Sequence, residues 1–125
     1  MSEGTIRVGR VSKVNYDTGM VRVTYPDMDD AVSAELSFLT SGDEYKMPKV
    51  GDNVLVSHLG SGQSRGVVLG TYWNKQHNSQ KTGQGVFRKE LAETPGEAYF
   101  DYDPASKTLT INAERVVING LVGQG

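Results

Sequence analysis

The strongest constraint in this sequence is a pair of short apolar segments that flank a small polar loop. Asn53–Leu59 and Arg65–Tyr72 are both rich in Val and Leu, and residues 60–64 between them read GSGQS. Segments this short, separated by a glycine-containing loop, are typical of a β-hairpin. Apolar residues fall on both faces of the first segment, as Val54 and Leu55 show. The pattern therefore predicts central strands of a small closed barrel rather than strands at an exposed edge.

Three further strands are expected before this hairpin, at Thr5–Val14, Met20–Tyr25 and Ala31–Phe38. The first strand cannot bury all its Ile and Val residues on one face, so a β-bulge is expected near Gly9-Arg10. The third strand alternates most cleanly, with Ser33, Glu35 and Ser37 outward. Its predicted inward set is Val32, Ala34, Leu36 and Phe38. Five strands with the longer connection between the third and the fourth predict an OB-fold, and a small SH3-like barrel is the alternative.

After the barrel, the chain becomes polar and then apolar again. Asn74–Pro95 has no alternating pattern and is interpreted as a linker, in which Phe87–Leu91 forms a short turn or docks onto the barrel. This linker is either disordered or, in an oligomer, lies along a neighbouring chain. A second unit follows, with strands predicted at Ala98–Tyr102, Lys107–Ala113 and Glu114–Asn119. The expected organisation is a barrel at 1–73, a linker at 74–95 and a β-structured segment at 96–125.

The C-terminal segment is too short to form a core of its own. A meander of this size cannot bury enough apolar surface to be stable alone. Docking on the chain's own barrel would supply a core, but the linker would then be long for a connection within one domain. Copies of the same segment from other chains are the more economical source, because cyclic symmetry gives every copy the same partner. The sequence thus predicts an intertwined β-helix or β-prism of three chains. The predicted trimer interface consists of Leu109, Ile111, Ala113, Val116 and Ile118.

Composition narrows the function classes. The chain has no cysteine, which excludes disulfide frameworks and cysteine-based zinc sites. Its apolar runs fall short of the roughly 20 residues that cross a bilayer, and its first ten residues have no signal-peptide core. We therefore expect synthesis in the cytoplasm without a signal peptide. The net charge of −2 disfavours nucleic acid as the main partner, because Lys and Arg supply most of the affinity for phosphates.

Two side-chain groups suggest metal binding, and both have plainer explanations. His58 could be a metal ligand or a base, but no second His or Cys is near it in sequence, so a structural or surface role is favoured. Asp27, Asp29 and Asp30 could hold a hard cation through their carboxylates. Their loop lacks the spacing of a calcium site, so a solvated turn is favoured.

A glycine loop and a basic cluster complete the candidates. Gly60–Gly62 lacks the Gly-Lys-Ser/Thr ending of a phosphate-binding loop and is interpreted as a hairpin loop. Four basic residues of the first two strands either bind nucleic acid on an OB-type barrel or dock onto an acidic protein surface. They are Arg7, Arg10, Lys13 and Arg22. We find no catalytic constellation, and no cofactor or metal site is predicted.

Three segments taken together resemble the phage baseplate assembly protein V family, the short central-spike proteins of contractile phage tails and phage-like injection particles. The segments read VGRVSKVNYDTGMVRVTYPDMDDAVSAEL, MPKVGDNVLVSHLGSGQSRGVVLGTYW and AYFDYDPASKTLTINAERVVING. The resemblance extends from about Ile6 to Gly120. Its specific part is the order of barrel, polar linker and repetitive β tail.

The resemblance implies a homotrimer whose OB-folds form a collar and whose C-terminal strands wind into a triangular β-helix. It implies a needle at the end of the tail tube that nucleates baseplate assembly, helps to puncture the target cell envelope and performs no chemistry. The implied partners are tail tube and baseplate hub proteins. The alternative function is an OB-fold module that binds single-stranded nucleic acid or oligosaccharide.

Two features of larger spikes are missing from this sequence. Asn74–Pro95 has no room for the lysozyme domain that some spikes insert between barrel and β-helix. His58 and His77 do not form the His-X-His motif that binds iron at some spike tips. The resemblance therefore leaves two possibilities for the tip: a blunt end closed by a separate tip-capping protein, or an apex built without metal.

Overall fold

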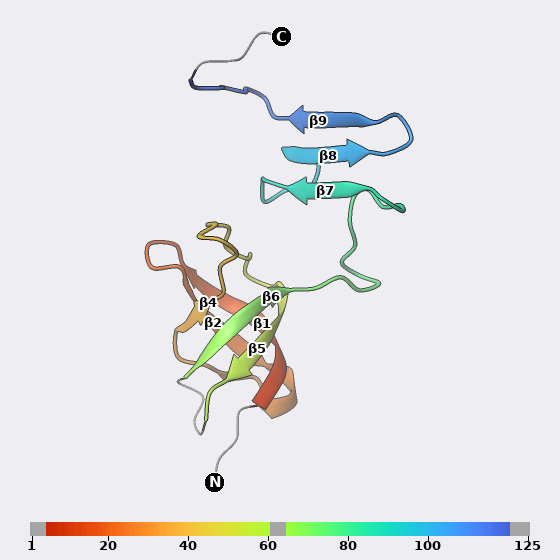
Figure 1. Cartoon of the computed structure of the whole chain (residues 1–125). Helices are drawn as coiled ribbons and strands as arrows, with labels where there is room; N and C mark the ends of the chain where they lie inside the picture. The colour runs from red at the N-terminus through yellow and green to blue at the C-terminus, as the bar shows by residue number, and fades with distance from the viewer. Residues whose placement is uncertain (1–4, 61–64, 121–125) are drawn as a thin grey trace. The chain divides into compact units, whose positions relative to one another are not determined.

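The computed structural model describes residues 5–60 and 65–120. The chain divides into two compact units between Asn74 and Lys75 (Figure 1). Apart from one short 3₁₀ helix, η1 (Pro26–Met28), every regular element of the described residues is a β-strand. Within that part of the chain, no helix has the length and apolar character that crossing a membrane requires.

The first unit is a closed β-barrel. Its strands are β1 (Thr5–Asn15), β2 (Met20–Tyr25), β3 (Ala31–Val32), β4 (Leu36–Phe38), β5 (Asn53–His58) and β6 (Gly66–Thr71). They follow the order β1-β5-β6-β4-β2-β3, and the additional pairing of β1 with β2 closes the sheet. With β3 and β4 counted as one interrupted strand, this is a five-stranded barrel of the OB type, as the sequence predicts.

The barrel core is made of valine side chains, one tyrosine and one leucine, and its members alternate along the strands. Its members are Val11, Val21, Val23, Tyr25, Leu36, Val54, Val56 and Val68. Gly9 lies directly over this core, and a Cβ at that position would overlap the Cγ1 atom of Val23. The close approach of β1 to β2 therefore requires glycine there.

The bulge in β1 is displaced from its predicted position at Gly9-Arg10. The register between β1 and β2 shifts between Val11 and Lys13, so Ser12 is the additional residue. Val11 is buried in the core and Val14 packs against it. Residues three apart point to opposite faces of a regular strand, so the extra residue is what lets both contact the core.

The third predicted strand is interrupted at Ser33. Its hydroxyl oxygen accepts a 3.0 Å hydrogen bond from the backbone N–H of Val23, and its own N–H donates to the carbonyl of Val23 at 2.8 Å. These two bonds turn Ser33 inward and its neighbours outward. The prediction that Val32 and Ala34 face the core is therefore wrong, since both are exposed, whereas Leu36 is buried as predicted.

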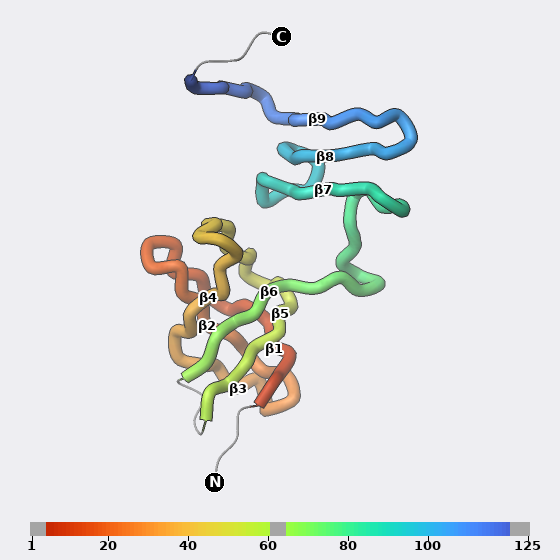
Figure 2. The backbone as a smooth tube through the Cα atoms, in the orientation of Figure 1, coloured from red at the N-terminus to blue at the C-terminus, as the bar shows by residue number. Residues whose placement is uncertain are grey.

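The second unit is a three-stranded antiparallel sheet in the order β7 (Phe87–Glu90), β8 (Tyr99–Asp103), β9 (Thr108–Asn112) (Figure 2). β7 lies inside the segment interpreted as a linker, and it is a strand that pairs with β8 rather than a short turn. The strand predicted at Glu114–Asn119 is absent from the described chain, because this segment finds no strand to pair with there.

Candidate assembly surface

The two faces of the β7–β8–β9 sheet differ sharply in chemistry. Residues directly opposite each other in an antiparallel sheet share a face. The first face carries the rows Phe87–Tyr102–Leu109 and Lys89–Phe100–Ile111. The second carries the rows Arg88–Asp101–Thr110 and Glu90–Tyr99–Asn112. We call the first the apolar face and the second the polar face.

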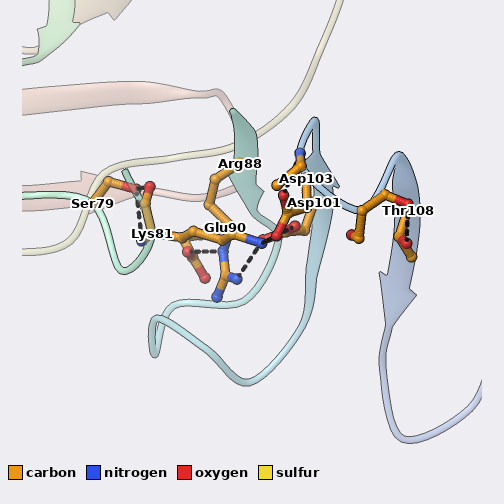
Figure 3. A network of polar contacts seen from close by, with 9 residues as sticks. Ser79, Lys81, Arg88, Glu90, Asp101, Asp103 and Thr108 are labelled. Carbon is orange, nitrogen blue, oxygen red and sulfur yellow. Dashed lines mark hydrogen bonds and ion pairs between the residues drawn. The ribbon is translucent and has the colours of Figure 1, made fainter. Parts of the chain in front are cut away.

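An ion-pair network satisfies the polar face from within the chain (Figure 3). The Asp101 carboxylate, only 4% exposed, accepts hydrogen bonds from Lys81 Nζ at 2.9 Å and from Arg88 Nη1 at 3.1 Å. Lys81 Nζ also lies 3.2 Å from Asp103, and Arg88 Nε donates to Glu90 at 2.7 Å. A buried carboxylate held by two cations has its charge compensated on both oxygens.

The network holds its members in their charged forms. The hydrogen bond from Lys81 is the main cause that lowers the pKa of Asp101, and the same bond raises the pKa of Lys81. The backbone N–H of Ala105, followed by Lys81, lowers the pKa of Asp103. Asp101, Asp103 and Lys81 thus stay ionised across the neutral range.

The segment that precedes β7 takes part in covering the polar face. Lys81 is fixed by Ser79, whose hydroxyl donates to the Lys81 carbonyl at 2.7 Å and accepts from the Lys81 N–H at 3.2 Å. On the sheet itself, the Arg88 guanidinium lies 3.4 Å from the ring centre of Tyr99. A cation stacked in this way gains further attraction from the ring. The polar face is therefore closed by the chain's own residues.

The apolar face remains uncovered in the single chain. Five large side chains on it are between 36% and 65% exposed: Phe87, Phe100, Tyr102, Leu109 and Ile111. An apolar area that spans every strand of a sheet is typical of an interaction surface. The charged residues of the polar face have partners within the chain, whereas the large side chains of the apolar face are left exposed. The apolar face is therefore the candidate functional site of the unit.

The predicted interface residues fall into two groups. Leu109 and Ile111 lie on β9 and point to the apolar face. Ala113, just past the end of β9, is exposed. Val116 and Ile118 are 49% and 69% exposed and lie outside any strand of the described chain. Their common role in a trimer interface stays a prediction.

Three aromatic residues of the apolar face were not among the predicted interface residues. Phe87 and its neighbour Val86 lie in an otherwise polar stretch without an alternating pattern, which hid the strand that carries Phe87. Phe100 and Tyr102 alternate in the right way, but the adjacent Tyr99 places an aromatic ring on the opposite face and obscures the pattern. The register of β8 against β9 would have distinguished the two faces, since it places Phe100 and Tyr102 opposite Ile111 and Leu109 and places Tyr99 opposite Asn112.

The barrel has an uncovered apolar area of its own. Ile6 and Val8 are 58% and 50% exposed on the outer face of β1, and the register places Val8 beside Leu55. Val67 and Leu69 on β6 extend the area, the latter at a second bulge. The pair of strands β5 and β6 therefore has one apolar face in the core and another that is only partly covered. We call this second area the barrel patch.

The remaining candidates have structural contacts. His58 is 4% exposed, and its Nε2 shares a 2.7 Å hydrogen bond with the Tyr25 hydroxyl, whose pKa is raised by burial. Asp27 lies 3.5 Å from Arg7 in a partly exposed ion pair. Across the described residues, no three His, Cys, Asp or Glu side chains gather as a metal site would require.

The glycine loop and the basic cluster carry less information. Residues 61–64 lie outside the described residues, so the predicted hairpin loop is described only at Gly60, which has a φ of 70°. Of the basic residues, Arg22 donates to the Ser33 carbonyl at 3.4 Å, while Arg10 and Lys13 are exposed.

Comparison with known proteins assigns the first unit to a family. A family model described as Type VI secretion system/phage-baseplate injector OB domain matches residues 7–73, which is more than half of the 125-residue chain. The matched segment contains β2 to β6 and nearly all of β1, and it ends before the second unit. No curated protein matches the chain.

Proposed function

Because this chain belongs to the Type VI secretion system/phage-baseplate injector OB domain family, we propose that it is the central spike of a contractile tail or a related injection particle. The match confirms the resemblance to phage baseplate assembly protein V and supports a structural role in a baseplate. In this proposal three copies form a needle at the end of the tail tube. The needle nucleates baseplate assembly and helps to puncture the target cell envelope.

The observation that carries the proposal is the uncovered apolar face of the β7–β8–β9 sheet. A needle of three chains needs a dry interior and an outside that tolerates water. Each sheet offers both, since Phe100 and Ile111 would turn toward the symmetry axis while Asp101 and its cations would turn outward. Separating the chains would expose all three apolar faces at once, which suits an element that transmits compression.

The barrel supplies the contacts to the rest of the particle in this proposal. Membership of the family implies association with other baseplate components. We assign the contact with tube and hub proteins to the barrel patch and to the exposed basic residues Arg10 and Lys13. The C-terminal end of the needle would receive a separate tip-capping protein. The role is mechanical rather than catalytic, and it is carried out in the baseplate of a virion or a released particle.

The mass of the protein in solution tests the proposal. Light scattering at several concentrations is expected to give a constant mass of three chains. A monomer at all concentrations would leave the apolar face without its partner and would contradict the spike. Binding of a labelled oligonucleotide or oligosaccharide by that monomer would instead support the OB-module alternative.

A further inference from the structure

We propose that Asn119 is a site of spontaneous deamidation, at which the backbone nitrogen of Gly120 attacks the side-chain amide and a carboxylate finally replaces that amide. The inference concerns the covalent chemistry of the chain and does not depend on the proposed function. It rests on three features of these two residues: their order in the sequence, their place outside the sheet and the open space around Gly120.

Asn119 is the one asparagine of the chain that a glycine follows, since the other five precede Tyr, Val, Lys, Ser or Ala. A side chain on the residue after asparagine crowds the approach of the backbone nitrogen to the amide carbon. Glycine carries only hydrogen there, and its backbone reaches conformations that other residues avoid. Ring closure therefore meets less resistance at Asn119 than at any other asparagine of this sequence.

The Asn119–Gly120 peptide lies in a part of the chain that has left the three-stranded sheet (Figure 1). Residues 113–120 are all exposed and belong to no strand of the described chain. Asn112, by contrast, lies within β9 and pairs with Tyr99. Ring closure requires the peptide after the asparagine to rotate, and a backbone outside the ladder rotates without breaking strand pairing. The fold thus leaves Asn119 more reactive than Asn112.

Gly120 has open space around it. Its φ is 101°, in the region that glycine enters freely and that other residues rarely adopt. A Cβ at this position would meet no heavy atom of the described residues within 4 Å, its chain neighbours aside. Water and hydroxide therefore have access to the Gly120 nitrogen, and no described side chain packs where the backbone must move.

The reaction balances with water and hydroxide alone. Hydroxide removes the proton of the Gly120 N–H, and the nitrogen forms a bond to Cγ of Asn119. The C–N bond of the side-chain amide breaks, and the leaving nitrogen takes a proton from water and departs as ammonia. Water then opens the five-membered succinimide at either carbonyl carbon, which gives aspartate or isoaspartate. In isoaspartate the backbone runs through the former side chain, and both products carry one additional negative charge.

The new charge lies beside exposed apolar side chains. Ile118 is 69% exposed, and Val116 and Val117 are 49% and 62% exposed. A carboxylate next to them makes this segment harder to bury, because an ionised group must be dehydrated when it leaves water. Chains that have reacted therefore form a more acidic population whose C-terminal segment is less suited to a dry contact.

Tryptic peptide mapping of the intact protein, aged at mildly alkaline pH, tests the proposal. Cleavage after Arg115 releases residues 116–125, in which Asn119 is the one asparagine. Cleavage after Lys107 releases residues 108–115, in which Asn112 serves as the internal control. The mass change from amide to carboxyl is expected to accumulate manyfold faster in the first peptide, and faster still at higher pH. Fragment spectra assign the change to Asn119 rather than Gln124.

Gly120→Ala is the matched variant, because it adds a single carbon at a position with open space around it. The added carbon hinders ring closure, so conversion of Asn119 is expected to slow manyfold while that of Asn112 is unchanged. Labelling by an isoaspartate methyltransferase should fall in parallel, since isoaspartate forms only through the ring. An unchanged rate in Gly120→Ala would overturn the proposal.

The variant Ile111→Asp, expected to be a single chain, shows whether contacts between copies cover the site. Slow amide hydrogen exchange in β8 verifies that the sheet of this variant is folded. Conversion of Asn119 in both proteins, or in this variant alone, would support the proposal, and the second result would show in addition that assembly protects the segment. If Asn119 reacted no faster than Asn112 in either protein, the proposal would be overturned.

Discussion

Gly9 shows how much a single position controls the barrel. It has no room for a side chain, because a Cβ would overlap Val23 Cγ1 in the core. We expect Gly9→Ala to destabilise the protein by about 1–3 kcal/mol, the usual cost of overpacking. Denaturant unfolding followed by the fluorescence of Trp73 measures this change. Ser12→Ala, at an exposed position of the same strand, is the control and should change stability by less than about 0.5 kcal/mol.

A second residue-scale prediction concerns the Lys81–Asp101 pair. Because the Lys81 hydrogen bond is the largest cause of the lowered pKa of Asp101, Lys81→Met is expected to raise that pKa toward the usual value of about 3.9. An NMR titration of the Asp101 carboxyl carbon gives the pKa directly. The control is Lys107→Met, which removes an exposed lysine of the β8–β9 turn. An unchanged pKa in Lys81→Met would show that Arg88 alone holds the carboxylate.

The ion pairs of Lys81 with Asp101 and Asp103 make the stability of the second unit depend on pH. The pKa values of Asp101 and Asp103 are lowered, so their contribution is present above the usual pKa and is lost as the pH falls through the folded value. The pKa of Lys81 is raised, so its contribution is lost as the pH rises through its folded value. Amide hydrogen exchange in β8 should therefore quicken below about pH 4 relative to its intrinsic rate. Asp101→Asn is expected to weaken this dependence.

At the scale of elements, the two faces of one strand make opposite predictions. Ile111→Asp would place a charge on the apolar face of each copy, beside Phe100, and is expected to prevent assembly, giving the mass of one chain by light scattering. Asn112→Asp adds the same charge on the adjacent, polar side of β9 and should leave the assembly intact. If the Ile111→Asp protein stayed trimeric, the copies would have to meet elsewhere.

Strands with a regular alternation of apolar and polar residues were predictable from the sequence. β2 has the predicted bounds, Met20–Tyr25, because its inward residues all pack in the barrel. β8 and β9 lie within about one residue of prediction because apolar and polar residues alternate along β9 and a short turn joins the two strands, although neither strand contributes to the barrel core. Leu109 and Ile111 could be placed on one face from their spacing alone.

Elements defined by distant partners were not predictable in this way. The sequence of β7 looks polar because Arg88 lies within it, and Arg88 forms an ion pair with Asp101, a residue thirteen positions away. The break between β3 and β4 depends on the bonds between Ser33 and Val23. The strand expected at Glu114–Asn119 shows the converse, since apolar residues alone do not make a strand without a neighbour to pair with.

At the scale of the whole molecule, the two units should be separable. Every residue of the barrel core precedes Lys75, so a fragment of residues 1–74 is expected to unfold cooperatively with a core of its own. Because the fragment lacks the apolar face, light scattering should show a monomer, with at most weak association through the barrel patch. A stable trimer of residues 1–74 would transfer the main contact between copies from the sheet to the barrel.

The uncovered apolar face also has a consequence for the life of the newly made protein. In the proposed assembly, each copy exposes these apolar side chains until other copies bind, and β7 and β9 are the edge strands of the sheet that carries them. Dilution therefore favours misdirected adhesion over correct assembly. We expect synthesis in bursts from neighbouring ribosomes to improve the yield, and slow or sparse production to fail first by precipitation rather than by loss of the barrel.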